Sequence, residues 1–230
     1  MAINIAVFVP EGMVVASDCL SVIKIKQDDG YRHVNANRTF DLFHKYIISF
    51  CGDGFLLGLP YGYYVTRFQQ DNWNVSNQRP LEIAKIFVDY LKELFKITNC
   101  DCFYIAGYDK INNHNVPLIA YFDSDDFHVV NSDADNNHVY NFHAIGETYW
   151  IYKLLLNTKF AGSENTLEFG NINIDFSKYS LPDAIVFAKA LLRITRQMDY
   201  ICQFSEKVGE KLTIATLSPL KGVDIQELDR

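Results

Sequence analysis

The stretch from residue 37 to residue 54, NRTFDLFHKYIISFCGDG, contains the features that decide the fold. It begins with a cation, Arg38, continues into the apolar run YIISFC, and ends in the glycines Gly52 and Gly54. An apolar run bounded by glycines predicts a short buried strand. Upstream, INIAVFVPEGMVVASD predicts a hairpin with strands at residues 3–9 and 13–17, and this segment ends at Asp18.

The remaining chain alternates between strand and helix patterns. Apolar residues at three-to-four spacing predict helices, and short apolar runs between Asn/Asp-rich turns predict strands. Ser180 is the expected N-cap of the last helix, and the segment at 157–179 is an insertion or extended loop. The expected strands are 20–26, 46–51, 102–108, 116–122, 127–130 and 212–217, and a charged tail follows the last of them. The expected helices are 56–69, 81–96, 147–156 and 181–204. The first turns of helix 56–69 are doubtful because they contain Gly58, Pro60 and Gly62. This order indicates an α+β fold of stacked sheets with helices outside.

Composition limits the class of protein. A chain of 230 residues with 49% hydrophobic residues is sufficient for one domain spanning 1–230. The net charge of −7, without any Lys/Arg run, argues against a nucleic-acid partner. The sequence shows no secretory signal and no apolar stretch of the ~20 residues needed to cross a membrane. Five scattered cysteines indicate reduced thiols, and we therefore expect a cytoplasmic protein without a membrane partner.

The order of motifs resembles the proteasome-type branch of the N-terminal-nucleophile (Ntn) hydrolases, the family of the 20S proteasome subunits. GMVVASD and RTFDLFHKYIISFCG resemble its first aspartate and its basic residue, strand and glycine. CFYIAGYD, AIGETYWIYKLLL and YSLPDAIVFAKALLRITRQMD resemble its central strand, a glycine-led helix and a long helix ending in aspartate. The resemblance covers most of the chain except 157–179. It implies a four-layer αββα sandwich, in which two antiparallel sheets pack between helix pairs.

The resemblance also implies positions for an active site, and several of them carry the wrong residue. Family members use a Thr, Ser or Cys at the mature N-terminus, whose own α-amine accepts the side-chain proton. That position falls on Ala2, so removal of Met1 leaves an amine beside a methyl group, and we expect no propeptide. The catalytic lysine falls on Arg38, the two aspartates on Asp18 and Asp199, the oxyanion glycine on Gly52, and the two supporting serines on Glu147 and Cys202.

These replacements predict a remnant pocket without catalysis. Arg38 keeps the charge of a lysine but stays protonated, so we expect a buried ion pair with Asp18. Gly52 is expected to let two backbone segments approach. Without the resemblance, Asp18 is explained as a cap of a turn, Asp199 as a solvated helix-end acid, Glu147 as a helix-dipole partner and Cys202 as a small apolar side chain.

Other polar and aromatic clusters have simple explanations as well. No metal site or cofactor is expected, because the pair Cys100 and Cys102 lacks a second ligand pair. The acidic segment Asp133–Asn137 lacks the glycine and glutamate of a calcium loop and is interpreted as a solvated turn. His138 and His143 are interpreted as surface or cross-strand residues. The aromatic residues of the first helix pack either in the core or against neighbouring subunits, and they are Tyr61, Tyr63, Tyr64 and Phe68.

Three functions follow from these patterns. The first is a proteasome subunit-like protein without peptidase activity, a structural or binding component of an oligomer built from itself or from related subunits. The second is a peptide or amide hydrolase whose nucleophile is Cys19, Ser17 or Cys51. The third is an α+β protein that binds a small molecule in a sheet-lined pocket.

Overall fold

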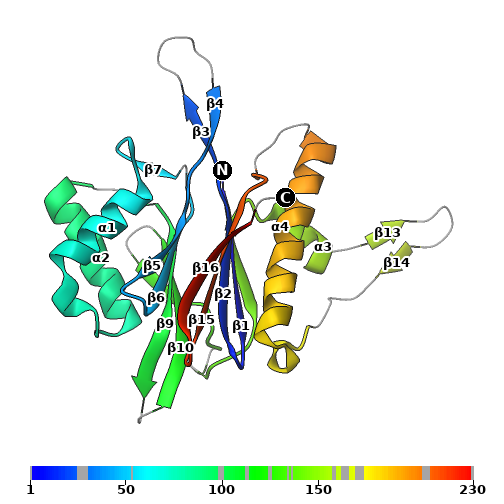
Figure 1. The fold of residues 1–230 in the computed structure, drawn as a ribbon. Coiled ribbons are helices and arrows are strands. Elements are labelled where there is room, and N and C mark those ends of the chain that lie inside the picture. Colours follow the sequence, from blue (N-terminus) through cyan, green and yellow to red (C-terminus); the bar gives the residue numbers. More distant parts are fainter. Residues whose placement is uncertain are drawn as a thin grey trace.

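The computed structural model has two five-stranded antiparallel sheets and four α-helices among the residues it describes (Figure 1). The described residues are 2–24, 31–52, 54–97, 101–111, 114–123, 126–133, 135, 137–156, 159–161, 166–168, 174–203 and 208–228. The fold is therefore of the α+β class with antiparallel sheets, as the sequence predicts.

The first sheet contains the N-terminal hairpin and the C-terminal hairpin side by side. Its strand order is β12 (Phe142–Gly146), β1 (Ile3–Val9), β2 (Gly12–Asp18), β15 (Leu212–Ser218) and β16 (Gly222–Leu228). The pairing places Asp18 opposite Leu212, so the start and end of the chain share one sheet. Nearly every side chain of β1 and β2 is buried, which explains why both strands are continuous apolar runs.

The second sheet is a meander extended by the strand from the YIISFC segment. Its order is β11 (Asp126–Val129), β10 (His114–Asp123), β9 (Phe103–Ile111), β6 (Tyr46–Phe50) and β5 (Thr39–Leu42). Three small hairpins accompany the two sheets, formed by β3 (Leu20–Lys24) with β4 (Tyr31–Asn35), β7 (Phe55–Leu56) with β8 (Leu59–Pro60), and β13 (Lys159–Ala161) with β14 (Thr166–Glu168).

Helices lie on the outer faces of both sheets (Figure 1). The helices α1 (Tyr61–Asp71) and α2 (Pro80–Phe95) pack on the second sheet, and α3 (Tyr149–Leu156) and α4 (Leu181–Gln203) pack on the first. Two 3-10 turns, η1 (Trp73–Val75) and η2 (Phe176–Lys178), precede α2 and α4. None of the helices in the described part of the chain is long and apolar enough to cross a membrane.

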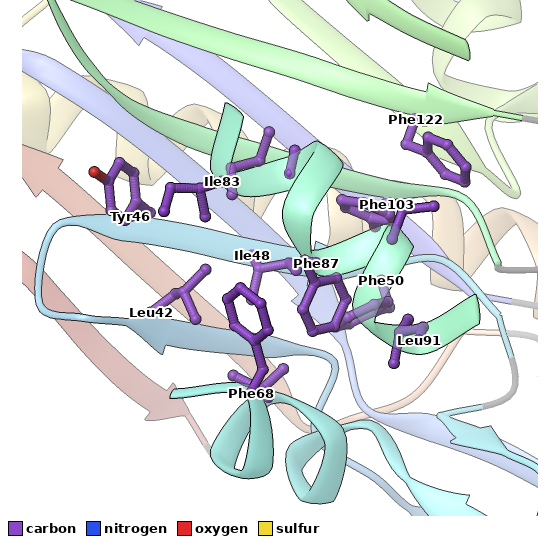
Figure 2. Close-up of a cluster of buried hydrophobic side chains, with 14 of the residues drawn as sticks. Leu42, Tyr46, Ile48, Phe50, Phe68, Ile83, Phe87, Leu91, Phe103 and Phe122 are labelled. Atoms are coloured by element: carbon purple, nitrogen blue, oxygen red, sulfur yellow. The ribbon is translucent and has the colours of Figure 1, made fainter. Parts of the chain in front are cut away.

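Three apolar clusters hold these layers together. The first lies between α1, α2 and the second sheet, and Figure 2 shows its aromatic centre around Phe50, Phe68, Phe87 and Phe103. The second lies between the first sheet and α4, with Ile151 of α3. The third lies between the two sheets and includes Phe8, Met13, Tyr104 and Ile119. Because successive side chains of a strand point to opposite faces of the sheet, neighbouring residues of β1 belong to different clusters. Val7 lies in the second cluster and Phe8 in the third.

Several element predictions are confirmed and two are wrong. Helices α2 and α4 lie within one residue of the expected bounds, and α4 begins with a reciprocal cap in which Asp183 N donates to Ser180 Oγ at 3.3 Å and Ser180 N donates to Asp183 Oδ2 at 3.0 Å. The first helix starts at Tyr61 and not at 56, since Pro60 ends the β7–β8 hairpin before it.

The other correction concerns the segment expected to be a charged tail. The charged tail after 217 is strand β16, paired with β15 along its whole length. The segment 157–179 contains the β13–β14 hairpin and a 3-10 turn whose Phe176 is buried against the first sheet, while residues 157–158, 162–165 and 169–173 lie outside the described residues.

Candidate functional site

Arg38 lies at the centre of the candidate site and is fully buried. It stands directly before β5, with the ends of β2 and β6 on either side. Its Nε donates to the Gly52 carbonyl at 2.9 Å, and its Nη1 donates to the Asp18 carbonyl at 2.8 Å. Its Nη2 donates to the Leu20 carbonyl and to Ser21 Oγ, the latter at 3.1 Å. These contacts provide acceptors for four of the five N–H groups of the guanidinium, and the Asp18 carboxylate lies 3.5 Å from Nη1 as its counter-charge.

Asp18 completes the expected ion pair. Its Oδ1 lies 3.5 Å from Arg38 Nη1 and accepts a hydrogen bond from Ile3 N at 3.0 Å. Its Oδ2 accepts from Leu20 N at 3.1 Å and from Gly209 N at 3.0 Å. Burial raises the pKa of the carboxyl above its ordinary value, while Arg38 and these three N–H groups oppose the rise. Three N–H groups donate to the carboxylate and the Arg38 cation lies beside it, so the geometry fits the ionised form. The contact from Leu20 N caps the turn after β2, as the sequence alone suggests, but the carboxylate is buried and also pairs with Arg38.

Ala2 lies beside this ion pair, because Ile3 follows it in the chain and donates to Asp18. The carbonyl of Ala2 accepts a hydrogen bond from Glu147 N at 2.9 Å. Gly146, the last residue of β12, has φ of +91°, and a Cβ at this position would collide with the Ala2 carbonyl. A glycine is therefore required to bring the loop before α3 onto Ala2.

Glu147 is nearly buried, so it is more than a solvated partner of the helix dipole. The structure also places Asp199 in a buried position on α4, where its Oδ1 accepts a hydrogen bond from Trp150 Nε1 at 3.1 Å. The interpretation of Asp199 as a solvated helix-end acid is wrong, because Trp150 of α3 covers it. Cys202 belongs to α4, and its side chain lies outside the described residues.

Gly52 is a point of close approach, although its neighbours are side chains and not a second backbone segment. A Cβ at Gly52 would lie 2.5 Å from Asp101 Oδ2 and 2.6 Å from Tyr61 Oη. Its carbonyl is occupied by Arg38, so the guanidinium fixes this turn to the end of β2.

The three alternative nucleophiles are not activated in this structure. Ser17 Oγ shares a buried chain of hydroxyl contacts with Thr39 Oγ1 at 2.8 Å, which continues from Thr39 to Ser49 Oγ at 2.6 Å. Burial raises the pKa of Cys19, whose sulfur contacts Thr213 Oγ1 at 3.2 Å. Burial raises the pKa of Cys51 to about 12. Both thiols are therefore protonated at neutral pH, whereas a nucleophilic cysteine needs its thiolate.

The contact between Tyr104 and His143 is not predicted by the sequence analysis. Tyr104 Oη and His143 Nδ1 lie 2.6 Å apart between the two sheets, with Tyr104 fully buried. Burial lowers the pKa of His143 and raises that of Tyr104 well above its ordinary value, so a neutral tyrosine donates to a neutral imidazole. The sequence leaves His143 as either a surface or a cross-strand residue; its pairing with Ala6 shows the cross-strand position, and nothing in the sequence identifies Tyr104 as the partner.

The described residues include no group of His, Cys, Asp and Glu able to hold a metal ion. The turn at Asp133 is closed by its own carboxylate, which accepts from Asp135 N at 2.9 Å and Asn137 N at 2.8 Å. Cys102 Sγ contacts Asp123 Oδ1 at 3.3 Å, and Cys100 lies outside the described residues. Comparison of the sequence with protein-family models and with curated proteins finds no match, so the functional argument depends on the geometry of this buried centre.

Proposed function

We propose that the chain is a proteasome-like protein of the Ntn-hydrolase fold without peptidase activity, which acts as a structural or binding component of an oligomer. The arrangement of the three apolar clusters supports the fold. One cluster joins two helices to a sheet, one joins the two sheets, and one joins the other sheet to the remaining helices. This succession is what a four-layer αββα sandwich requires.

The observation that carries the proposed loss of activity is that all three guanidinium nitrogens of Arg38 donate to neighbouring groups of the chain. In the arrangement implied by the resemblance, a lysine stands free to assist a nucleophile and its amine. Here the cation is a guanidinium whose donors all contact the Gly52 carbonyl, Asp18, Leu20 and Ser21. Ala2, which precedes the residue that donates to Asp18, offers only a methyl group. The centre therefore holds three chain segments together, and the described position that the resemblance assigns to the nucleophile carries no hydroxyl or thiol.

Exposed apolar side chains support the assembly role. Leu57 and Leu59 of the β7–β8 hairpin are 72% and 42% exposed, and Tyr63 on the adjoining helix α1 is 46% exposed. The remaining aromatic residues of α1, Tyr61, Tyr64 and Phe68, are buried in the core. Apolar side chains grouped on one surface favour contact with another protein surface. We propose that this surface, defined by Leu57, Leu59 and Tyr63, contacts another copy or a related subunit.

Native mass spectrometry of the purified chain tests the assembly role. We expect a defined oligomer that Leu57→Glu shifts toward the monomer. Leu220→Glu is the matched control, because Leu220 is 97% exposed on a different turn. A monomeric wild-type chain, or equal dissociation by both variants, would contradict the assembly role.

A second measurement tests the absence of activity. We expect no hydrolysis of a panel of fluorogenic peptides and no labelling of Ser17, Cys19 or Cys51 by an electrophilic peptide probe. Hydrolysis that disappears in Cys51→Ala or Cys19→Ala would instead establish the hydrolase alternative.

A further inference from the structure

A groove of about 530 Å³ lies at the end of the sheets opposite to the candidate site. β9 runs away from Phe103, which pairs with Phe50 beside the candidate site, and its far end contributes Tyr108, Asp109 and Lys110 to the groove. The turn between β5 and β6, the loop before α2, the start of β10 and the turn between β15 and β16 form the other walls. The groove is therefore built from segments of both sheets that are distant in sequence.

The lining of this groove is cationic although the whole chain carries a net charge of −7. Lys45, Arg79 and Lys110 contribute three full positive charges. Asp109 is the acidic residue of the lining, and it is only 3% exposed. Arg79 Nε contacts both of its carboxylate oxygens, at 3.0 and 2.9 Å. The Asp109 carboxylate therefore neutralises the charge of Arg79. Lys45 and Lys110 are not paired with an acidic residue of the lining, so their two positive charges remain in the groove.

Contacts behind the groove fix its walls. Tyr46 Oη donates to the Gln78 carbonyl at 2.5 Å, and burial raises its pKa to about 12, so it remains a neutral donor. Lys45 Nζ donates to Asn77 Oδ1. A Cβ at Gly107 would lie 2.7 Å from both Pro80 and Tyr46, so glycine lets the start of α2 approach β9. The loop before α2 is thus held against both the β5–β6 turn and β9, which preorganises the groove for a ligand.

We propose that this groove binds a small anionic molecule through a carboxylate or phosphate group. Lysine and arginine are the residues that bind such oxygens by charge-assisted hydrogen bonds, and Arg79 is already oriented by Asp109. The amides of Gln78 and Asn115 line the same groove and supply neutral donors. The volume lies within the range of about 300–1,000 Å³ typical of small-molecule sites. This binding is independent of the proposed loss of peptidase activity.

Titration of the full chain with pyrophosphate and with citrate, followed by calorimetry and by amide chemical shifts, tests the proposal. We expect at least one of the two anions to bind with a dissociation constant below about 10 mM and to shift amides of the groove. The preferred anion then distinguishes a phosphate ligand from a carboxylate ligand. Absence of binding by both anions up to that concentration would overturn the proposal.

Reversing single charges of the groove distinguishes binding at this site from general electrostatic attraction of anions to the protein. Lys45→Glu and Lys110→Glu are each expected to weaken binding by about tenfold or more, because each replaces an attraction by a repulsion inside the groove. Arg193→Glu on the exposed face of α4 changes the net charge equally and should leave binding unchanged. Arg79 is kept in all variants, since its removal would leave buried Asp109 without its cation. Equal weakening by Arg193→Glu, or none by the two lysine variants, would show that the groove is not the site.

Discussion

At the scale of single residues, Arg38 is expected to contribute mainly to stability. Replacing it by methionine would leave the buried Asp18 carboxylate without a counter-charge and three carbonyl groups without a donor. We predict that Arg38→Met lowers the free energy of unfolding by about 3–5 kcal/mol, measured by urea denaturation. Arg193→Met, at an exposed position, should change it by less than about 0.5 kcal/mol.

A double-mutant cycle distinguishes the ion pair from packing. Because the uncompensated charge causes much of the loss, Asp18→Asn combined with Arg38→Met should cost less than the sum of the two single changes. Strict additivity, or a wild-type stability for Arg38→Met, would show that the two side chains act separately.

His143 gives a prediction for pH. Burial lowers its folded-state pKa below the ordinary value of 6.5, so the unfolded chain binds more protons between the two values. Its contribution is present above pH 6.5 and is lost as the pH falls through the folded pKa. We predict that His143→Gln flattens this part of the stability profile, on the acidic side of pH 6.5. His33→Gln, at an exposed position of β4, is the control, and an unchanged profile in His143→Gln would contradict the assignment.

At the scale of elements, β16 is an integral strand of the first sheet. Val223 and Ile225 pack against the cluster between the sheets, whereas Gln226 is exposed. We predict that Ile225→Ala lowers the free energy of unfolding by about 1–3 kcal/mol because it removes part of a half-buried side chain. Gln226→Ala should have little effect. Equal stability of the two variants would mean that β16 contributes only its backbone hydrogen bonds.

The same strand shows where sequence reasoning fails. Segments buried on both faces, such as β1 and β2, are continuous apolar runs and can be predicted directly. β16 has one face toward solvent, and its polar residues Asp224, Gln226 and Glu227 interrupt the alternation of apolar and polar side chains. The sequence pattern therefore predicts a charged tail here and not a strand. In α1 the pattern is clear but the start is not, because periodicity does not show that Pro60 closes a hairpin.

At the scale of the whole molecule, the cluster between the sheets predicts cooperative unfolding. Trp150 reports on the α3–α4 side, and the amides of α2 report on the opposite side. We predict that Trp150 fluorescence in a Trp73→Phe background and hydrogen exchange of α2 give the same free energy of unfolding in urea. Two separate transitions would show that each sheet and its helices form an independent unit.

The sequence predicts which residues meet in the candidate site but not which contacts they make. The spacing of Asp18, Arg38 and Gly52 identified residues that the structure brings together. The N–H donors of Leu20 and Gly209 to Asp18, and the Ser21 hydroxyl that accepts from Arg38, could not be predicted, because they depend on turns and on long-range pairing. The role of Trp150 in covering Asp199 likewise follows from the packing of α3 on α4.

Under the proposed function, the contacts of Arg38 limit how a peptidase activity could arise in this chain. A hydroxyl placed at position 2 by a single substitution would stand near a guanidinium whose three nitrogens already donate to the chain's own carbonyls and to Ser21. Catalysis would require the guanidinium to be released as well, and its release would loosen the ends of β2 and β6. A catalytic variant of this chain would therefore be less stable than the present protein.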